Sequence, residues 1–230
     1  MRLEEFQEGK TFIIDKPLRW TSFDVVNKLR WHIKEKLGVK KIKVGHAGTL
    51  DPLATGLLIL CSGKHTKLIE TIQGGLKTYT GTILLGKTTP SYDLEKEFDK
   101  EYPIDHITEE MMEDVRASFE GVQDQLPPIF SAKQVNGRRA YDLARAGKEV
   151  ELQPNEIEVQ YMTIETSRFP EIDFEIQSSK GTYIRSIAHD FGQKLNSGGT
   201  LIALRRTASG EFSIQNSTTV EQFIEDLEKL

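Results

Sequence analysis

The sequence has little of the features that would define a secreted or membrane protein. Its 230 residues include one cysteine, Cys61, so no internal disulfide can form. No aliphatic run exceeds the four residues Leu57 to Leu60, far short of the ~20 apolar residues of a transmembrane helix. The first ten residues contain three glutamates where a signal peptide requires an apolar stretch. We therefore expect a cytoplasmic protein with no membrane partner.

An overall excess of positive charge, the usual sign of a nucleic-acid partner, is also missing. The chain has 30 Lys and Arg against 35 Asp and Glu, a net charge of −5. The distribution is uneven, however, because residues 1–50 carry 11 basic and 6 acidic side chains whereas residues 92–120 carry 3 and 11. Charges are screened over ~8 Å at physiological salt, so a partner responds to the local face. We expect the basic stretches to form one polyanion-binding face, away from the acidic ones.

Hydrophobic spacing predicts an α+β protein. Ser22 is the expected N-cap of a helix that ends at Gly38, and Thr219 with Gln222 predicts a capping box for a last helix. Strands and helices mix without a βαβ period, which favours one α+β domain over residues 1–230. The other predicted elements are helices over 108–119 and 184–195 and strands over 79–85, 157–161 and 172–176.

Residues 81–88, GTILLGKT, match the pattern of a phosphate-binding loop. Such a loop requires a flexible turn after a strand and a helix N-terminus that supplies amide donors. Here the four intervening residues are Thr-Ile-Leu-Leu, a strand interior, and Thr89-Pro90-Ser91 follows where the helix would begin. The match therefore predicts a strand rather than a nucleotide site.

Residues 45–58, GHAGTLDPLATGLL, carry the strongest chemical signal. Gly45 and Gly48 permit a tight backbone around His46, and the proline that follows Asp51 restricts the chain there. This pattern predicts one carboxylate on a short, rigid, solvent-facing loop. An ordinary turn in which Asp51 caps a helix gives the same pattern. The sequence shows no second nearby carboxylate, no Cys/His cluster and no G-x-S-x-G, so it offers little support for paired-acid hydrolysis, a zinc site or a serine triad.

GHAGTLDPLATGLL resembles the signature of the TruB family of tRNA pseudouridine-55 synthases. Other segments of the chain resemble motifs of that family in the same order: 15–26 (DKPLRWTSFDVV), 76–86 (LKTYTGTILLG), 125–147 (QLPPIFSAKQVNGRRAYDLARAG), 180–192 (KGTYIRSIAHDFG) and 201–212 (LIALRRTASGEF). The resemblance covers most of residues 12–212. It implies the pseudouridine synthase fold, with a mixed, mainly antiparallel central sheet flanked by helices.

The resemblance also implies an activity, the isomerisation of uridine to pseudouridine at position 55 in the T loop of tRNA. Asp51 matches the family's nucleophile, Arg185 the arginine that pairs with it, and Tyr79 the tyrosine that stacks on the target uracil. The target base must leave the folded loop before it reacts. Further matches line the nucleotide pocket, and these are His46, Tyr183 and Leu204. For the last two, core packing is an equally good interpretation. The family requires neither a cofactor nor a metal, so we expect none.

An insert over about 124–150 resembles the segment with which the family grips RNA. Its basic side chains suit phosphate contacts, and they are Lys133, Arg138, Arg139 and Arg145.

Two departures from the family pattern stand out. The acidic turn T-D-T-x-D reads TTPSYD over 88–93, and we assign it no role although Asp93 could replace part of it. Only 18 residues follow Phe212, so we expect no separate C-terminal RNA-binding domain. Separately, we expect the protein to be a monomer. A non-catalytic tRNA-binding or folding protein that retains the pocket is the alternative.

Overall fold

The computed structural model describes residues 2–131, 133–135, 138–139 and 152–230. The chain forms two compact units: unit 1 comprises Met1–Tyr79 and Leu204–Leu230, and unit 2 comprises Thr80–Ala203. Two strands pass from one unit to the other, and these are β4 (Lys77–Leu85) and β12 (Gly199–Ser209).

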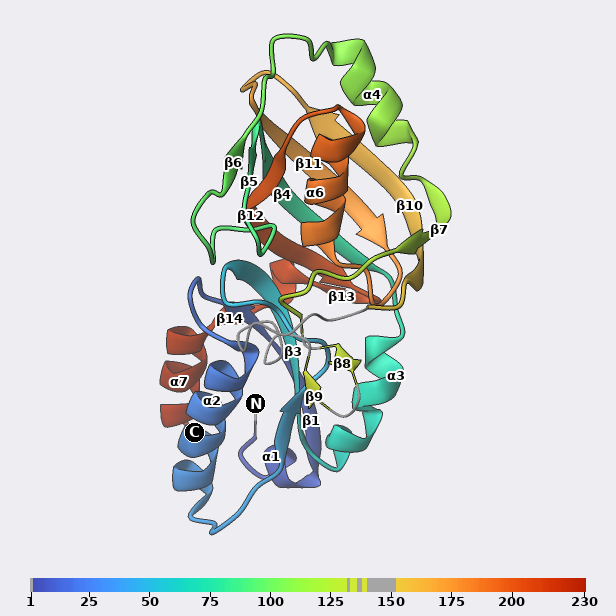
Figure 1. Cartoon of the computed structure of the whole chain (residues 1–230). Helices are drawn as coiled ribbons and strands as arrows, with labels where there is room; N and C mark the ends of the chain where they lie inside the picture. The colour runs from blue at the N-terminus through green and yellow to red at the C-terminus, as the bar shows by residue number, and fades with distance from the viewer. Residues whose placement is uncertain (1, 132, 136–137, 140–151) are drawn as a thin grey trace. The chain divides into compact units, whose positions relative to one another are not determined.

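Unit 1 contains a mixed sheet with the strand order β14-β1-β3-β12 (Figure 1). β1 pairs antiparallel with β3 and parallel with β14, while β12 pairs parallel with β3. The short strands β2 and β13 pair with β3 and β12. The strand bounds are β1 (Gly9–Lys16), β2 (Val44–His46), β3 (Ala54–Gly63), β13 (Phe212–Ser213) and β14 (Thr218–Thr219).

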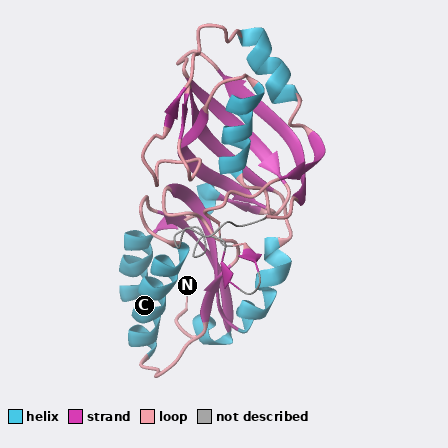
Figure 2. Ribbon diagram, viewed as in Figure 1, coloured by secondary structure: helices cyan, strands magenta, loops and turns pink. Residues whose placement is uncertain are grey.

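The helices of unit 1 cover both faces of this sheet (Figure 2). α2 and α7 lie side by side and pack against one face through a cluster that includes Phe6, Leu58 and Phe223. Leu57 and Ile59 point to the opposite face, where Ile69 of α3 packs against them. β3 is therefore buried on both sides, which is why its apolar run does not alternate with polar residues. The helices are α1 (Glu5–Glu8), α2 (Ser22–Leu37), α3 (Ile69–Gln73), α7 (Val220–Glu228) and the short 3-10 helices Lys64–Leu68 and Ile214–Asn216.

Unit 2 is built on the strand order β4-β11-β10-β7, in which β10 pairs antiparallel with both β11 and β7. Every second residue of β11 is buried, and α6 buries Ile187 and Phe191. The elements are β5 (Lys87–Thr88), β6 (Lys100–Glu101), α4 (Glu109–Ala117), β7 (Gly121–Gln125), β8 (Gln134–Val135), β9 (Arg138–Arg139), β10 (Asn155–Glu165), β11 (Glu171–Ser178) and α6 (Ile184–Lys194).

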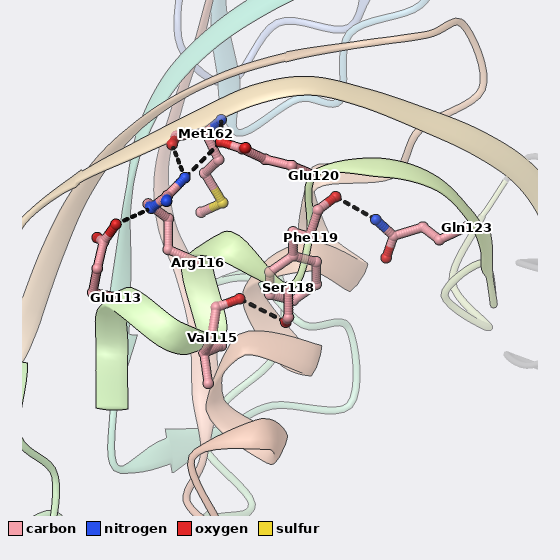
Figure 3. Close-up of polar contacts among 8 residues, drawn as sticks. All are labelled: Glu113, Val115, Arg116, Ser118, Phe119, Glu120, Gln123 and Met162. Atoms are coloured by element: carbon pink, nitrogen blue, oxygen red, sulfur yellow. Dashed lines mark hydrogen bonds and ion pairs between the residues drawn. The ribbon is translucent and has the colours of Figure 1, made fainter. Parts of the chain in front are cut away.

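Arg116 attaches α4 to β10. Its guanidinium pairs with Glu113 at 2.7 Å and with Glu120 at 2.5 Å, and it donates to the carbonyl oxygen of Met162 at 2.9 Å (Figure 3). The ring of Phe119, just after the helix, stacks on Phe191 of α6 with centroids 6.2 Å apart. α4 is thus fixed both to the sheet and to the neighbouring helix.

The observed elements confirm the predicted α+β class with a mixed sheet. Each predicted helix and strand is present, with small differences at its ends. The prediction that Ser22 caps its helix is wrong, because Thr21 is the N-cap and forms a reciprocal capping box with Asp24. Residues 81–88 lie in β4, a turn and β5, as expected for a strand. Among the described residues, no helix has the length and apolar character needed to cross a membrane.

Candidate active site

Asp51 lies in the seven-residue loop between β2 and β3 of unit 1, and its side chain is half-buried. The backbone just before it is fixed by Ser22, the first residue of α2. The Ser22 hydroxyl accepts from the Leu50 amide at 2.8 Å and donates to the Leu50 carbonyl oxygen at 3.1 Å. Just after it, the Ala54 amide donates to the Asp51 carbonyl oxygen at 3.1 Å. The loop thus presents its carboxylate from a backbone held on both sides.

Arg206 of β12 anchors the loop from within the protein. Its side chain is 1 % exposed. The guanidinium donates to the carbonyl oxygens of Leu57 at 2.8 Å and Gly48 at 3.1 Å. Gly48 has φ = +99°, and a Cβ there would lie 3.3 Å from Arg206 Nη1. A side chain at Gly48 would therefore strain the backbone and crowd the cation that holds it.

Lys16 supports the other end of the loop. It is fully buried, and its ammonium donates to the carbonyl oxygens of Pro17 at 2.9 Å, Trp20 at 2.5 Å and Pro52 at 3.5 Å. Burial lowers the pKa of Lys16 to about 8, although the charges of Asp51 and Asp24 act in the opposite direction. Lys16 therefore fixes the backbone next to Asp51 and also places a positive charge near its carboxylate.

Unit 1 also holds three of the other predicted site residues. His46 ends β2, four residues before Leu50, and Leu204 is the register partner of Ala54. Tyr79 lies in β4, and all three side chains are half-buried. Burial lowers the pKa of His46, a backbone hydrogen bond with Gly48 acts in the opposite direction, and the positive charge of Arg206 lowers the pKa further. The neutral imidazole therefore predominates at pH 7. Backbone register thus places His46 and Leu204 beside the two ends of the Asp51 loop.

Arg185 lies in the first turn of α6 in unit 2, where the helix dipole disfavours a cation. Its guanidinium donates to the carbonyl oxygens of Phe130 at 2.9 Å and Ser91 at 3.3 Å. Its Nε lies 3.7 Å from Oδ2 of Asp93, and both side chains are only 7 % exposed. These partners compensate the burial of the charge and fix the plane of the guanidinium.

Asp93, to which the sequence assigned no role, belongs to a turn tied together by its own side chains. The hydroxyls of Thr89 and Ser91 donate to the Asp93 carbonyl oxygen at 2.7 Å and 3.1 Å. The Glu95 amide donates to Asp93 Oδ1 at 3.0 Å. One carboxylate oxygen thus stabilises the turn while the other faces Arg185, so the TTPSYD turn positions the arginine.

Tyr183 is the N-cap of α6, and its side chain is half-buried. The side chain of Gln125 holds its backbone by accepting from the Tyr183 amide at 2.8 Å and donating to its carbonyl oxygen at 3.0 Å. Ser186 donates to the Leu126 carbonyl oxygen at 2.8 Å. The segment that leads into the insert is therefore attached to the same end of α6 as Arg185.

Part of the basic insert can be placed. The Lys133 ammonium donates to the Gln153 carbonyl oxygen and, at 2.6 Å, to Oδ1 of Asn155. Arg138 and Arg139 form β9, which pairs with β8. Arg145 lies outside the described residues. RNA contact by these four residues stays a prediction.

Sequence reasoning gave no role to Lys16 and Arg206, although each leaves a signal. In β1 the buried residues alternate, and Lys16 occupies the same face as Phe12 and Ile14. A lysine at an inward position predicts a buried cation with fixed partners. Arg205 and Arg206 are consecutive in a strand and must point to opposite faces, so one of them must point inward.

The arrangement in unit 1 suits a reaction that needs one carboxylate on a fixed backbone. Arg206 and Lys16 donate to carbonyl oxygens of the loop and of the segments beside it, so they hold its backbone in place. Within the ranges that the structure describes, no three His, Cys, Asp or Glu side chains gather as a metal-binding group. A carboxylate presented in this way can act as a nucleophile or as a base.

Solved structures place the fold among the pseudouridine synthases. A crystal structure of a Cbf5-Nop10-Gar1 complex matches 98 % of this chain with a TM-score of 0.72 and 26 % identity. This chain spans about half of that one, covering 56 % of its length. A structure of an H/ACA RNP bound to a substrate RNA matches with a TM-score of 0.69 and 25 % identity, over 98 % of this chain and 55 % of that one.

Sequence comparison identifies the family. Residues 34–184 match the TruB family pseudouridylate synthase (N terminal domain), and residues 185–229 match the tRNA pseudouridylate synthase B C-terminal domain. A protein of Phocaeicola vulgatus is 53 % identical over 97 % of this chain and 95 % of its own length. One of Flavobacterium johnsoniae is 49 % identical over 99 % of this chain and all of its own. Both are named tRNA pseudouridine synthase B. The chain belongs to the TruB family.

Proposed function

We propose that this protein isomerises uridine to pseudouridine at position 55 in the T loop of tRNA, with Asp51 as the nucleophile. The observation that carries the proposal is the half-buried Asp51 carboxylate on a loop fixed by Ser22, Lys16 and Arg206. Membership of the TruB family supplies the reaction class, and relatives named tRNA pseudouridine synthase B supply the substrate.

The reaction moves one glycosidic bond. The C1′–N1 bond breaks, the uracil turns, and a new bond forms between C1′ and C5. The C5 proton then leaves to solvent and N1 carries a proton, so atoms and charge balance without an oxidant or reductant. Asp51 can attack C1′, attack C6, or act in part as a base, and each route requires the carboxylate to be ionised and held still.

The other site residues take the following parts in the proposal. Arg185 pairs with the Asp51 carboxylate and keeps it ionised, which suits a guanidinium whose plane Asp93 and two carbonyl oxygens already fix. Tyr79 offers a ring face that holds the detached uracil. His46, which is neutral at pH 7, occupies the gap left by the flipped nucleotide. Tyr183 and Leu204 line the pocket.

Contacts outside the pocket complete the proposal. Lys133, Arg138, Arg139 and Arg145 of the insert bind backbone phosphates of the T stem-loop. The protein acts as a cytoplasmic monomer whose residues 1–230 form one catalytic domain, and it needs neither a cofactor nor a metal.

The experiment measures tritium release from C5-labelled uridine in a T-arm stem-loop. Asp51→Asn keeps the size of the side chain but removes its charge, so we expect pseudouridine formation to fall by ~10⁴-fold or more while binding of the RNA changes little. Asp226→Asn is the matched control, because that exposed carboxylate in α7 of the same unit bonds to Lys229 and Gln222. Full activity of Asp51→Asn would exclude Asp51 as the nucleophile. Tight binding without turnover by the wild type would instead identify a non-catalytic tRNA-binding protein.

A further inference from the structure

Unit 1 carries a second feature that the proposed chemistry does not use. A groove of about 940 Å³ lies between α2 and the segment that leads into β2. Of its eight lining residues five are cationic and none is acidic. We define the basic groove by the six residues used below, which are Arg30, Trp31, Lys34, Lys40, Lys41 and Lys43.

Most of this positive charge has no protein counterion. Lys34 pairs with Glu35 at 3.3 Å, and Arg30 is oriented by the side-chain oxygen of Asn27 at 2.6 Å. Arg30 and the three lysines over 40–43 form no ion pair with any other residue in the described part of the chain. Like charges this close repel one another, and their summed potential attracts a polyanion.

An exposed aromatic ring adds a second, chemically different signal. The Trp31 side chain is 54 % exposed. Its ring meets His32 edge-on, with centroids 4.6 Å apart and an interplanar angle of 89°. The exposed indole offers a flat apolar face on which a base or a ribose can pack. Cationic grooves that contain an aromatic platform are typical of surfaces that bind RNA, since phosphates meet the cations and bases or riboses meet the ring.

The basic groove lies within reach of an RNA whose loop is at Asp51. Ser22, which holds the residue before Asp51, begins the helix that carries Arg30 and Lys34. At 1.5 Å per residue these two lie roughly 12 Å and 18 Å along the helix from Ser22. Lys43 precedes His46 by three residues, roughly 10 Å in an extended strand. These spans equal only a few base pairs of a duplex.

We propose that the basic groove binds the backbone of the duplex stem of the substrate RNA, outside the reacting loop. The cations neutralise consecutive phosphates, and Trp31 packs on a ribose or an exposed base, so the contact is independent of base sequence. The identity of the RNA as tRNA rests on the proposed function. The proposal that this surface binds RNA rests on its cationic side chains, the exposed Trp31 ring and the position of both in unit 1.

The test compares two charge-matched double variants for affinity to an unmodified tRNA transcript. Lys40→Gln with Lys41→Gln removes two charges from the basic groove. Arg2→Gln with Lys229→Gln removes two exposed charges elsewhere in unit 1. We expect the first variant to bind about fivefold to tenfold more weakly at 0.15 M salt and to lower the slope of log Kd against log salt by about one to two. The second variant should match the wild type in both.

Tryptophan fluorescence gives an independent measurement. The chain has two tryptophans, so Trp20→Phe leaves Trp31 as the only indole. We expect tRNA to quench this emission with the same midpoint as the binding curve. Adding Lys40→Gln and Lys41→Gln should move that midpoint to higher tRNA concentration by the same factor as Kd.

The outcomes separate this inference from the proposed function. If the two double variants have equal affinity for tRNA and equal salt slopes, the proposal that the basic groove binds RNA is wrong, even if the wild type forms pseudouridine. The proposal would also be wrong if the Lys40→Gln and Lys41→Gln variant lost binding to anionic phospholipid vesicles but bound tRNA as the wild type does. If the wild type forms no pseudouridine while the Lys40/Lys41 variant still loses affinity and slope, the proposed function fails and the basic groove stands.

Discussion

The two units hold their main charged groups in different ways. In unit 1 the fixed element is a backbone loop, and the buried cations Lys16 and Arg206 bind its carbonyl oxygens. In unit 2 the fixed element is a side chain, because Arg185 is itself the bound cation. Asp51 is therefore presented by a rigid loop, whereas Arg185 is oriented by its own partners.

This difference has an energetic basis. A buried guanidinium or ammonium needs acceptors, and carbonyl oxygens supply them without cancelling its charge. Unit 1 uses this arrangement to position a carboxylate while keeping positive potential nearby. Unit 2 adds a carboxylate, since Arg185 faces Asp93 at 3.7 Å, longer than the 2.6 Å contact between Arg205 and Asp15. The predictions below test whether each arrangement serves catalysis or only stability.

After Asp51→Asn, the largest effect is expected from Arg185→Lys. A lysine keeps the charge, but one ammonium cannot reproduce the planar contacts to Ser91, Phe130 and Asp93. We expect kcat of the folded protein to fall by about 10²–10³-fold, while the buried acceptors that lose a donor lower the thermal midpoint modestly. Single-turnover tritium release and thermal denaturation measure the two quantities.

Arg116→Lys is the control for this prediction. Like Arg185, Arg116 of unit 2 contacts both carboxylates and a backbone carbonyl oxygen. These contacts attach α4 to β10 (Figure 3), so they serve the fold. Its substitution should lower stability without lowering kcat in the folded protein. Near-normal turnover by Arg185→Lys would show that the Arg185 arrangement is structural as well.

A smaller effect is expected from Arg206→Lys in unit 1. Arg206 uses two separate nitrogens, Nε for Leu57 and Nη2 for Gly48, and a single ammonium lacks that spacing. A buried acceptor left without a donor costs ~1–3 kcal/mol. The loop would then lose its fixed position, and we expect kcat to fall by roughly 10-fold to 100-fold with KM less affected.

The neighbouring residue provides the matched control. Arg205→Lys alters a partly exposed ion pair with Asp15, so stability should change by less than about 1 kcal/mol and kcat by little. Equal losses of kcat in the two variants would mean that the strand, rather than the anchor on the Asp51 loop, sets the rate.

Local sequence signals predicted the helices and strands better than the buried residues that hold the Asp51 loop, Lys16 and Arg206. The end of α2 follows from Gly38, which adopts φ = +65°, and the start of α7 follows from Thr219, which accepts from the Gln222 amide. Thr21 and Ser22 are equally good caps by residue type. The capping box with Asp24 selects Thr21, and Ser22 is used instead to hold Leu50.

The anchors of the site were missed because their partners are distant in sequence and are backbone atoms. Arg206 binds residues about 150 positions earlier, and any residue type offers a carbonyl oxygen. Asp93 was likewise undecided, since only the fold brings it to Arg185, 92 positions later. The glycines and the proline around Asp51 predict a tight loop, because those residues act on their own backbone, whereas its role as nucleophile stays a prediction from the family resemblance.

The smallest effect concerns the pH dependence of stability through Lys16. Its pKa is lowered from 10.5 to about 8 in the folded protein, chiefly by burial. Between those two values the unfolded chain binds the extra proton, so raising the pH favours the folded state. We therefore expect the free energy of unfolding of the wild type, relative to Lys16→Met, to increase from pH 8 toward pH 10.5, by at most about 1.4 kcal/mol per pH unit. Urea midpoints of both proteins across this range measure the difference. If the free energy of unfolding of the wild type relative to Lys16→Met does not increase over this range, the carbonyl partners stabilise the Lys16 ammonium at least as well as water does. Burial of Lys16 would then carry no free-energy penalty.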